Sequence, residues 1–162
     1  MPSEKSAGER SANEPPVLHT RDVRPDPDGP FPVDIPFIRA LGVHLIEFGD
    51  GRASLRLDLE RWHMNSFEMA HGGVVMTLID ISMVMAGRAQ PRDDDDPTKG
   101  LVTIEAKTNF MQPALGPSVF AHGRCVHRTS SMAFCESEIR DPEGRLVATG
   151  SGTFKYQKKR RN

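Results

Sequence analysis

The feature that most constrains the fold is the apolar segment from Gly72 to Gly87, which contains a single charged residue, Asp80. Its length favours a helix over a strand. Because it is apolar on nearly every side, such a helix must be enclosed by the rest of the protein. An unpaired buried charge is costly, so Asp80 must face a polar cavity, meet partners or remain protonated.

The segments around this helix have the patterns of a short helix and of strands. A helix is expected over 34–41, with Asp34 as its N-cap. Strands are expected over 42–48, 52–59, 101–110, 118–127, 132–141 and 145–156, separated by turn sequences. Gly150 and Gly152 indicate a bulge or a close packing contact in the last strand. We therefore predict an α+β fold in which a long antiparallel sheet wraps around one central apolar helix.

The start of the chain is rich in proline and charge. Eight of the 13 prolines precede residue 37, and such a stretch buries too little apolar surface to offset its ordering entropy. We expect residues 1–30 to be a flexible tail, 31–157 to form one domain and 158–162 to be a basic C-terminal tail. The aspartate-rich segment 91–97 is expected to be a solvated loop.

Composition argues against several classes of partner. The formal net charge of −1 gives no sign of a nucleic-acid partner or an acidic membrane surface. No apolar run approaches the roughly 18 residues of a membrane span, and no secretory signal is visible. Two cysteines, Cys125 and Cys135, do not make a disulfide framework, so a reducing cytoplasm is the simpler expectation. The histidines lack metal-ligand spacing and no phosphate loop is present, so neither metal nor cofactor is expected.

Gly72 and Gly73 start the predicted helix. Glycines let a ligand approach the backbone closely, and the first N–H groups of a helix have no intrahelical acceptor. These groups favour negative charge, including the charge that develops on a carbonyl oxygen under attack. Asp80 follows about two helical turns later, so an amide donor and a carboxylate could flank one reacting carbon, which suits acyl transfer to water. A Gly-Gly pair alone is usually a turn, so the joint spacing carries this prediction.

Asn65, His71-Gly72-Gly73 and Asp80 together resemble the signature of the phenylacetic-acid-degradation type of hotdog thioesterase, related to the Arthrobacter-type 4-hydroxybenzoyl-CoA thioesterases. The resemblance covers about residues 34–156 in element order. It implies the hotdog fold and the hydrolysis of an acyl-coenzyme A to a free acid and coenzyme A. The motif is specific for the family and poorly specific for the acyl group.

The resemblance also implies roles for single residues. Asp80 matches the catalytic carboxylate, which acts as general base toward water or as nucleophile. Gly72 matches the residue whose N–H polarises the thioester carbonyl, and Asn65 matches a loop amide that positions the thioester or the water. Thr103 matches a Ser or Thr that meets the active site of the other subunit. A homodimer with shared sites, commonly paired into a tetramer, is implied.

Four further positions are assigned to substrate binding. His71 matches a histidine that fixes the loop rather than shuttling protons, and Gly73 belongs to the same motif. Glu68 stands where the family frequently has glycine, which predicts a changed loop path. Its carboxylate is either solvated or disfavours anionic acyl groups. Arg128 lies in a predicted turn and is a candidate contact for the phosphates of coenzyme A.

Two other functions remain open at this point. The spacing of Asp58 and His63 resembles that of one hotdog hydratase family, without its Asn-Pro context, so a hydratase or dehydratase acting on acyl-CoA or acyl-carrier protein is the first alternative. The second is a module that binds acyl-CoA without turnover. The presence of both Asp80 and the helix-start glycines argues against that module.

Overall fold

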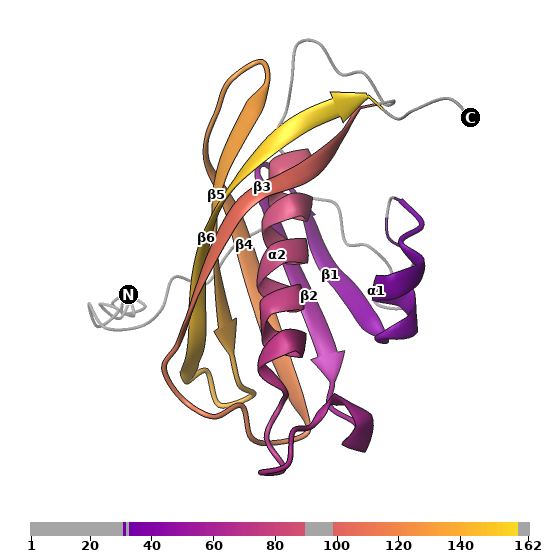
Figure 1. Ribbon diagram of the computed structural model, residues 1–162, viewed down its shortest axis with the longest axis vertical. Coiled ribbons are helices and arrows are strands. Elements are labelled where there is room, and N and C mark those ends of the chain that lie inside the picture. The colour runs from indigo at the N-terminus through magenta and orange to yellow at the C-terminus, as the bar shows by residue number, and fades with distance from the viewer. Residues whose placement is uncertain (1–30, 32, 90–98, 159–162) are drawn as a thin grey trace, which may run out of the picture.

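The computed structural model describes residues 31, 33–89 and 99–158. In chain order these form α1 (Pro36–Ala40), β1 (Val43–Gly49), β2 (Arg52–Asp58), the 3-10 helix η1 (Arg61–His63), α2 (Gly72–Ala89), β3 (Lys99–Phe110), β4 (Ser118–Arg128), β5 (Met132–Arg140) and β6 (Leu146–Lys158). The strands form one antiparallel sheet in the order β1-β2-β4-β5-β6-β3. The sheet curves around α2 (Figure 1), which confirms the predicted hotdog architecture.

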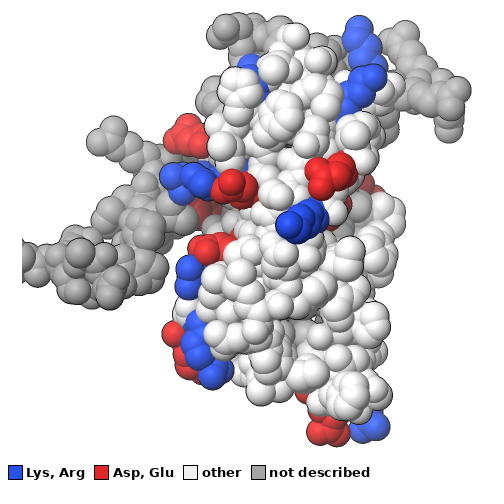
Figure 2. Space-filling view, turned by 60° about the vertical axis from the view of Figure 1, so that its left-hand side comes forward, with Lys and Arg blue, Asp and Glu red and all other residues white. Residues whose placement is uncertain are grey.

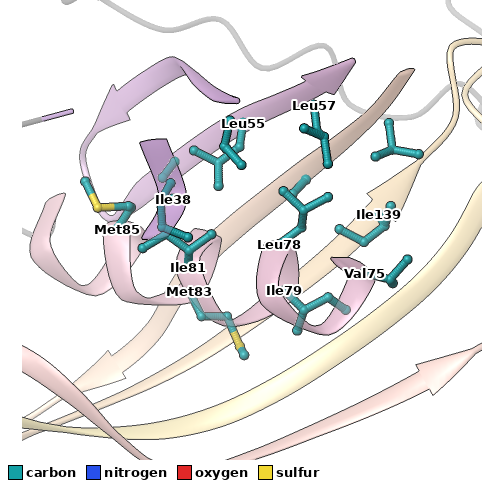
Figure 3. Close-up of a cluster of buried hydrophobic side chains, with 14 of the residues drawn as sticks. Ile38, Leu55, Leu57, Val75, Leu78, Ile79, Ile81, Met83, Met85 and Ile139 are labelled. Carbon is teal, nitrogen blue, oxygen red and sulfur yellow. The ribbon is translucent and has the colours of Figure 1, made fainter. Parts of the chain in front are cut away.

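The hydrophobic core lies between α2 and the sheet. Val75, Leu78 and Ile79 of the helix are almost fully buried and belong to one cluster with Leu57 of β2 and Ile139 of β5 (Figure 3). Fully burying one such side chain contributes about 1.5–3 kcal/mol. The apolar segment of the sequence is therefore stabilised mainly by the sheet face that it contacts.

Glycines in the sheet allow α2 to lie directly on the strands. A Cβ atom at Gly123 of β4 would collide with the backbone of Ser82, and one at Gly150 of β6 would collide with the Ile79 side chain. At the same contact the Ser82 hydroxyl lies 2.7 Å from that of Ser137, so both buried hydroxyls are satisfied. Of the two predictions made for Gly150, close packing is the one confirmed.

Some predicted boundaries are wrong. The N-cap of α1 is Ile35, without a side-chain cap, because Asp34 instead forms an ion pair of 2.6 Å with Arg39. Lys158 is the last residue of β6 rather than the first of a tail. The predicted tail over 1–30, the loop over 91–97 and the residues after Lys158 lie outside the described residues.

The length of α2 also exceeds the prediction, because the helix continues past Gly87 to Ala89. It has 18 residues with a mean hydropathy of 1.3, which by length and composition alone is enough to cross a membrane. Half of it is buried inside the protein, and the core helix of a globular domain meets the same criteria.

Charged side chains of both signs are interspersed on the face drawn in Figure 2, with wide uncharged surface between them. Several of the acidic and basic groups of the sheet pair with each other, such as Arg124 with Glu136 at 2.6 Å and Arg140 with Glu138 at 2.9 Å. The face in Figure 2 therefore has no stripe of positive charge of the kind that binds a nucleic-acid backbone.

Candidate active site

The loop that leads into α2 is organised by Asn65. Its side-chain Oδ1 accepts hydrogen bonds from the N–H groups of Phe67 (2.9 Å) and Met69 (3.3 Å). Its own backbone N–H donates to the Met69 carbonyl at 2.8 Å. Because the loop uses the oxygen of the amide, the Nδ2 group remains as a donor, and it donates to no other side chain or backbone group within the described ranges.

Glu68 lies in the same loop with a φ of 59°, in the left-handed region that glycine adopts freely. A residue with a Cβ costs roughly 1–2 kcal/mol there. Glu68 therefore takes the backbone conformation that favours glycine, so the substitution does not by itself require a new loop path. The side chain is exposed and does not line the pocket described below, which supports the interpretation that Glu68 is solvated.

His71 caps the start of α2. Its Nδ1 accepts a hydrogen bond of 2.9 Å from the Gly73 N–H, and its backbone N–H donates to the His63 carbonyl at 2.8 Å. A Cβ at position 73 would lie only 3.0 Å from that Nδ1, so glycine lets the imidazole reach the amide. His71 thus connects the loop to the start of α2 by hydrogen bonds, and its ring occupies the Gly73 amide that a ligand would otherwise use.

Gly72 is left with a free amide at the start of the helix, since its N–H has no acceptor in the part of the chain that the structure describes. A Cβ built there would meet only the Phe110 ring, at an ordinary 3.6 Å. The protein's own packing therefore does not require glycine at position 72. The space beside Gly72 belongs to a pocket, and Gly72 forms part of its wall.

This pocket has a volume of about 390 Å³ and lies between the loop, the start of α2 and the end of β3. Every side chain that lines it is uncharged: Asn65, Met69, Ala70, Gly72, Val75, Phe110, Met111, Gln112, Pro113, Ala114 and Val147. An uncharged, mostly apolar cavity with a few placed polar groups is the usual form of a small-molecule site. Asn65 and Gly72 supply the donors at its wall.

Asp80 lies farther along α2, half-buried on the stripe of the helix that the sheet leaves uncovered, with Gly73, Met76, Thr77 and Val84. Its Oδ1 accepts a hydrogen bond of 2.7 Å from the Thr103 hydroxyl of β3. It forms no ion pair with any described Lys, Arg or His. The carboxylate is therefore held by a neutral donor and stays available to solvent or a ligand.

From the sequence we predicted that the Gly72 amide and Asp80 face one small cavity. Within the single chain, the two groups lie in different places. The rise of a helix separates the two residues by about 12 Å, and Asp80 does not line the pocket. β3 connects the two places, because Phe110 at its end lines the pocket while Thr103 near its start contacts Asp80. The pairing of β3 with β6 shifts register between Thr103 and Glu105, beside this contact. Such irregularities often re-aim side chains next to active sites.

Two other predicted site residues have the following places. The Thr103 hydroxyl contacts Asp80 of the same chain, and its predicted approach to the active site of another subunit stays a prediction. Arg128 ends β4, where it pairs with Ala133, and Ala133 lies beside Gly87 of α2. It is therefore at the opposite end of α2 from Gly72 and does not line the pocket. A contact between Arg128 and coenzyme A stays a prediction.

The spacing of Asp58 and His63 has a structural explanation. Asp58 is exposed and forms an ion pair of 2.6 Å with Arg56. His63 is buried, its Nδ1 accepts the Glu60 N–H at 2.9 Å, and its Nε2 lies 3.1 Å from the Leu41 carbonyl oxygen. Both ring nitrogens of His63 are thus used inside the protein, which weakens the hydratase alternative.

Sequence reasoning missed the apolar wall of the pocket. Phe110 and Met111 are both more than half exposed at the end of β3, and Val147 of β6 lies beside them. The only local signal is a pair of large apolar residues next to the Gln112-Pro113 turn. Among the described residues, no cluster of three or more His, Cys, Asp or Glu is placed to hold a metal ion.

Comparison with known proteins places this geometry in a family. The family model described as "Thioesterase superfamily" matches residues 67–148, just over half of the chain. Human acyl-coenzyme A thioesterase 13 is 26% identical over 120 residues, covering 72% of this chain and 82% of that protein. The structure of the E. coli PaaI protein from the phenylacetic acid degradation operon is similar with a TM-score of 0.67 and 20% identity, covering 75% of this chain and 83% of PaaI. A Bacillus halodurans protein solved with CoA has a TM-score of 0.69 and 25% identity, covering 80% and 83% of the two chains. The chain belongs to the thioesterase superfamily.

Proposed function

We propose that the protein is an acyl-CoA thioesterase in which Asp80 assists the attack of water on a thioester carbonyl polarised at the start of α2. The observation that carries the proposal is that the free Gly72 amide and the unused Nδ2 donor of Asn65 both belong to the wall of one uncharged pocket. Two donors on one pocket wall can together stabilise the negative charge of a tetrahedral intermediate on a carbonyl oxygen bound between them. The uncharged lining suits an acyl group without charge.

The role of Asp80 is supported by its contact with Thr103. The Thr103 hydroxyl donates to Oδ1, which fixes the carboxylate and leaves Oδ2 to accept a proton from water. Direct attack by the carboxylate on the thioester is the competing mechanism. Single-turnover hydrolysis in isotopically labelled water tests the nucleophile: label in Asp80 would show an anhydride that water opened at the Asp80 carbonyl carbon, whereas a general base places the label only in the acid product.

Coenzyme A as the leaving group is supported by the relatives, one of which is named an acyl-coenzyme A thioesterase and another of which was solved with CoA. The experiment is release of free thiol from a panel of aryl, short, medium and long acyl-CoAs. We expect turnover of at least one member of the panel. Loss of enoyl-CoA absorbance without thiol release would favour a hydratase, and tight binding of acyl-CoA without either reaction would favour a binding module.

We also propose that the active form is a homodimer in which a second copy covers β3 and the open stripe of α2. β3 is a long edge strand, and Val102, Ile104 and Met76 are exposed by 44%, 58% and 49%. Such edges and apolar patches are usually covered. Within one chain, Asp80 does not line the pocket. A second copy packed over β3 and α2 would supply the surface that connects the two.

Light scattering after size-exclusion chromatography tests this assembly and separates dimer from tetramer. Ile104→Lys is expected to give monomers and to abolish activity, because it places a charge on the edge strand. Val126→Lys, on the inner strand β4 and 52% exposed, is the matched control and should leave the assembly intact. A monomeric wild type with full thioesterase activity would contradict the proposal.

A further inference from the structure

The two cysteines of the chain are direct partners across neighbouring strands. Cys125 of β4 pairs in register with Cys135 of β5, and both thiols are free. Opposed residues of an antiparallel pair have Cα atoms about 4.5–5.5 Å apart. A disulfide requires Cα atoms about 4.4–6.8 Å apart. The two residues are therefore close enough to be joined without moving the strands.

The surroundings of the two thiols differ. Cys125 is half-buried, whereas Cys135 is 2% exposed. Hydrogen bonding from the Cys135 thiol, with the positive charge of Arg128, lowers the pKa of Cys125 to about 7 against the effect of burial. The same hydrogen bond and burial raise the pKa of Cys135. Cys125 is thus the more acidic of the two thiols and the first to become a nucleophilic thiolate, whereas Cys135 keeps its proton.

Arg128 is a second group that favours the thiolate form of Cys125. Its Nη1 is buried and has no hydrogen-bond partner within the described part of the chain. A guanidinium group that has no carboxylate partner among the described residues and lies close to a thiol stabilises the thiolate form. While it is protonated, the Cys125 thiol donates a hydrogen bond of 3.6 Å to the His127 carbonyl oxygen, and loss of the proton releases the sulfur from this contact.

We propose that Cys125 and Cys135 form a peroxide-sensitive dithiol that closes reversibly into an intrachain disulfide. The thiolate of Cys125 attacks one oxygen of hydrogen peroxide, the O–O bond breaks and hydroxide leaves, so that Cys125 becomes a sulfenic acid. The Cys135 sulfur then attacks the Cys125 sulfur, the S–S bond forms and the S–O bond breaks. The proton of Cys135 leaves with that hydroxide as water. Overall, two thiols are oxidised and one peroxide is reduced to two waters.

The dithiol is separate from the candidate active site. Cys135 contacts the far end of α2, where a Cβ at Gly87 would lie 3.4 Å from its sulfur. The Tyr156 hydroxyl donates to the Gly87 carbonyl at 3.0 Å in the same place. Neither cysteine lines the pocket at Gly72. The inference therefore does not depend on the proposed function.

The test is oxidation of the full-length protein by a small molar excess of hydrogen peroxide at neutral pH. Free thiols, titrated under denaturing conditions, should fall from two per chain to none and return after dithiothreitol. Peptide mapping should find Cys125 joined to Cys135 within one chain. In Cys135→Ser, which keeps a hydroxyl donor beside Cys125 but cannot form the disulfide, dimedone should trap a sulfenic acid at Cys125, whereas Cys125→Ser should give no adduct at Cys135. Both variants are first checked for folding by circular dichroism.

Three results would overturn the proposal. Two thiols that survive the peroxide would show that Cys125 is not reactive. A disulfide found only between chains would show that the pair does not close. Stable sulfinic acid at Cys125 in the wild type, with Cys135 unchanged, would show that Cys135 does not resolve the sulfenic acid.

Discussion

A glycine stands near each end of α2, Gly72 at the start and Gly87 close to the end. The two glycines have opposite surroundings. At Gly72 a Cβ would meet only the Phe110 ring at 3.6 Å, and the space beside it is the pocket. At Gly87 a Cβ would lie 2.9 Å from Leu101 Cδ1 and 3.4 Å from the Cys135 sulfur, so protein atoms fill the space. A glycine in a motif therefore indicates a ligand site only where no other protein atoms fill the space that its missing side chain would take.

The largest expected effect is at Asp80, which lies between the two ends on the open side of the helix. Asp80→Asn should lower the rate of thiol release by roughly 10²- to 10⁴-fold, because the amide cannot take a proton from water. The amide still accepts the Thr103 hydroxyl, so thermal stability should change little. Asp58→Asn, which removes an exposed carboxylate on β2, is the control and should keep full activity. Wild-type turnover by Asp80→Asn would remove the assignment.

The next largest effect concerns the donor at the open end. Asn65→Asp keeps the oxygen that accepts the Phe67 and Met69 amides but removes the Nδ2 donor. We expect the loop to stay folded while thiol release falls roughly 10²- to 10³-fold, the range for a lost oxyanion contact. Gln157→Ala, which removes an exposed amide at the end of β6, serves as control. Thiol release at the wild-type rate would mean that Asn65 only shapes the loop.

Alanine at each end of the helix tests the comparison directly. Gly72→Ala should keep or raise the free energy of unfolding, by up to about 1 kcal/mol. Its methyl group would displace the substrate, and a displacement of about 1 Å can cost on the order of 10²-fold in rate.

Gly87→Ala should show the reverse pattern. Crowding against Leu101 and Cys135 should destabilise the protein by about 1–3 kcal/mol, while the folded fraction keeps its activity. Urea titration and thiol release measure both quantities for each variant. Equal loss of stability at the two positions would contradict the distinction between an open and a filled end.

The parts of this protein that the sequence predicts well are those decided by local pattern. The apolar run of α2, the alternation in β2 and the turn sequences between strands are all local, and so is the motif from Asn65 to Asp80. What could not be predicted depends on the packing of β3 against α2. The contact of Thr103 with Asp80 of its own chain and the place of Phe110 in the pocket both follow from this long-range packing. No local pattern in either segment specifies that packing.

The smallest expected effect is at Glu68, which stands where the family frequently has glycine. Its φ of 59° favours glycine, so Glu68→Gly should stabilise the protein by about 1 kcal/mol, measured by urea titration. Glu143→Gly is the matched control, since Glu143 is an exposed acidic turn residue without a positive φ and should lose stability instead. Because Glu68 is exposed outside the pocket, its removal should not alter the preference among acyl-CoAs. Faster hydrolysis of acyl groups with a free carboxylate by Glu68→Gly would contradict this expectation. It would show that the Glu68 side chain reaches the substrate and that its negative charge disfavours anionic acyl groups.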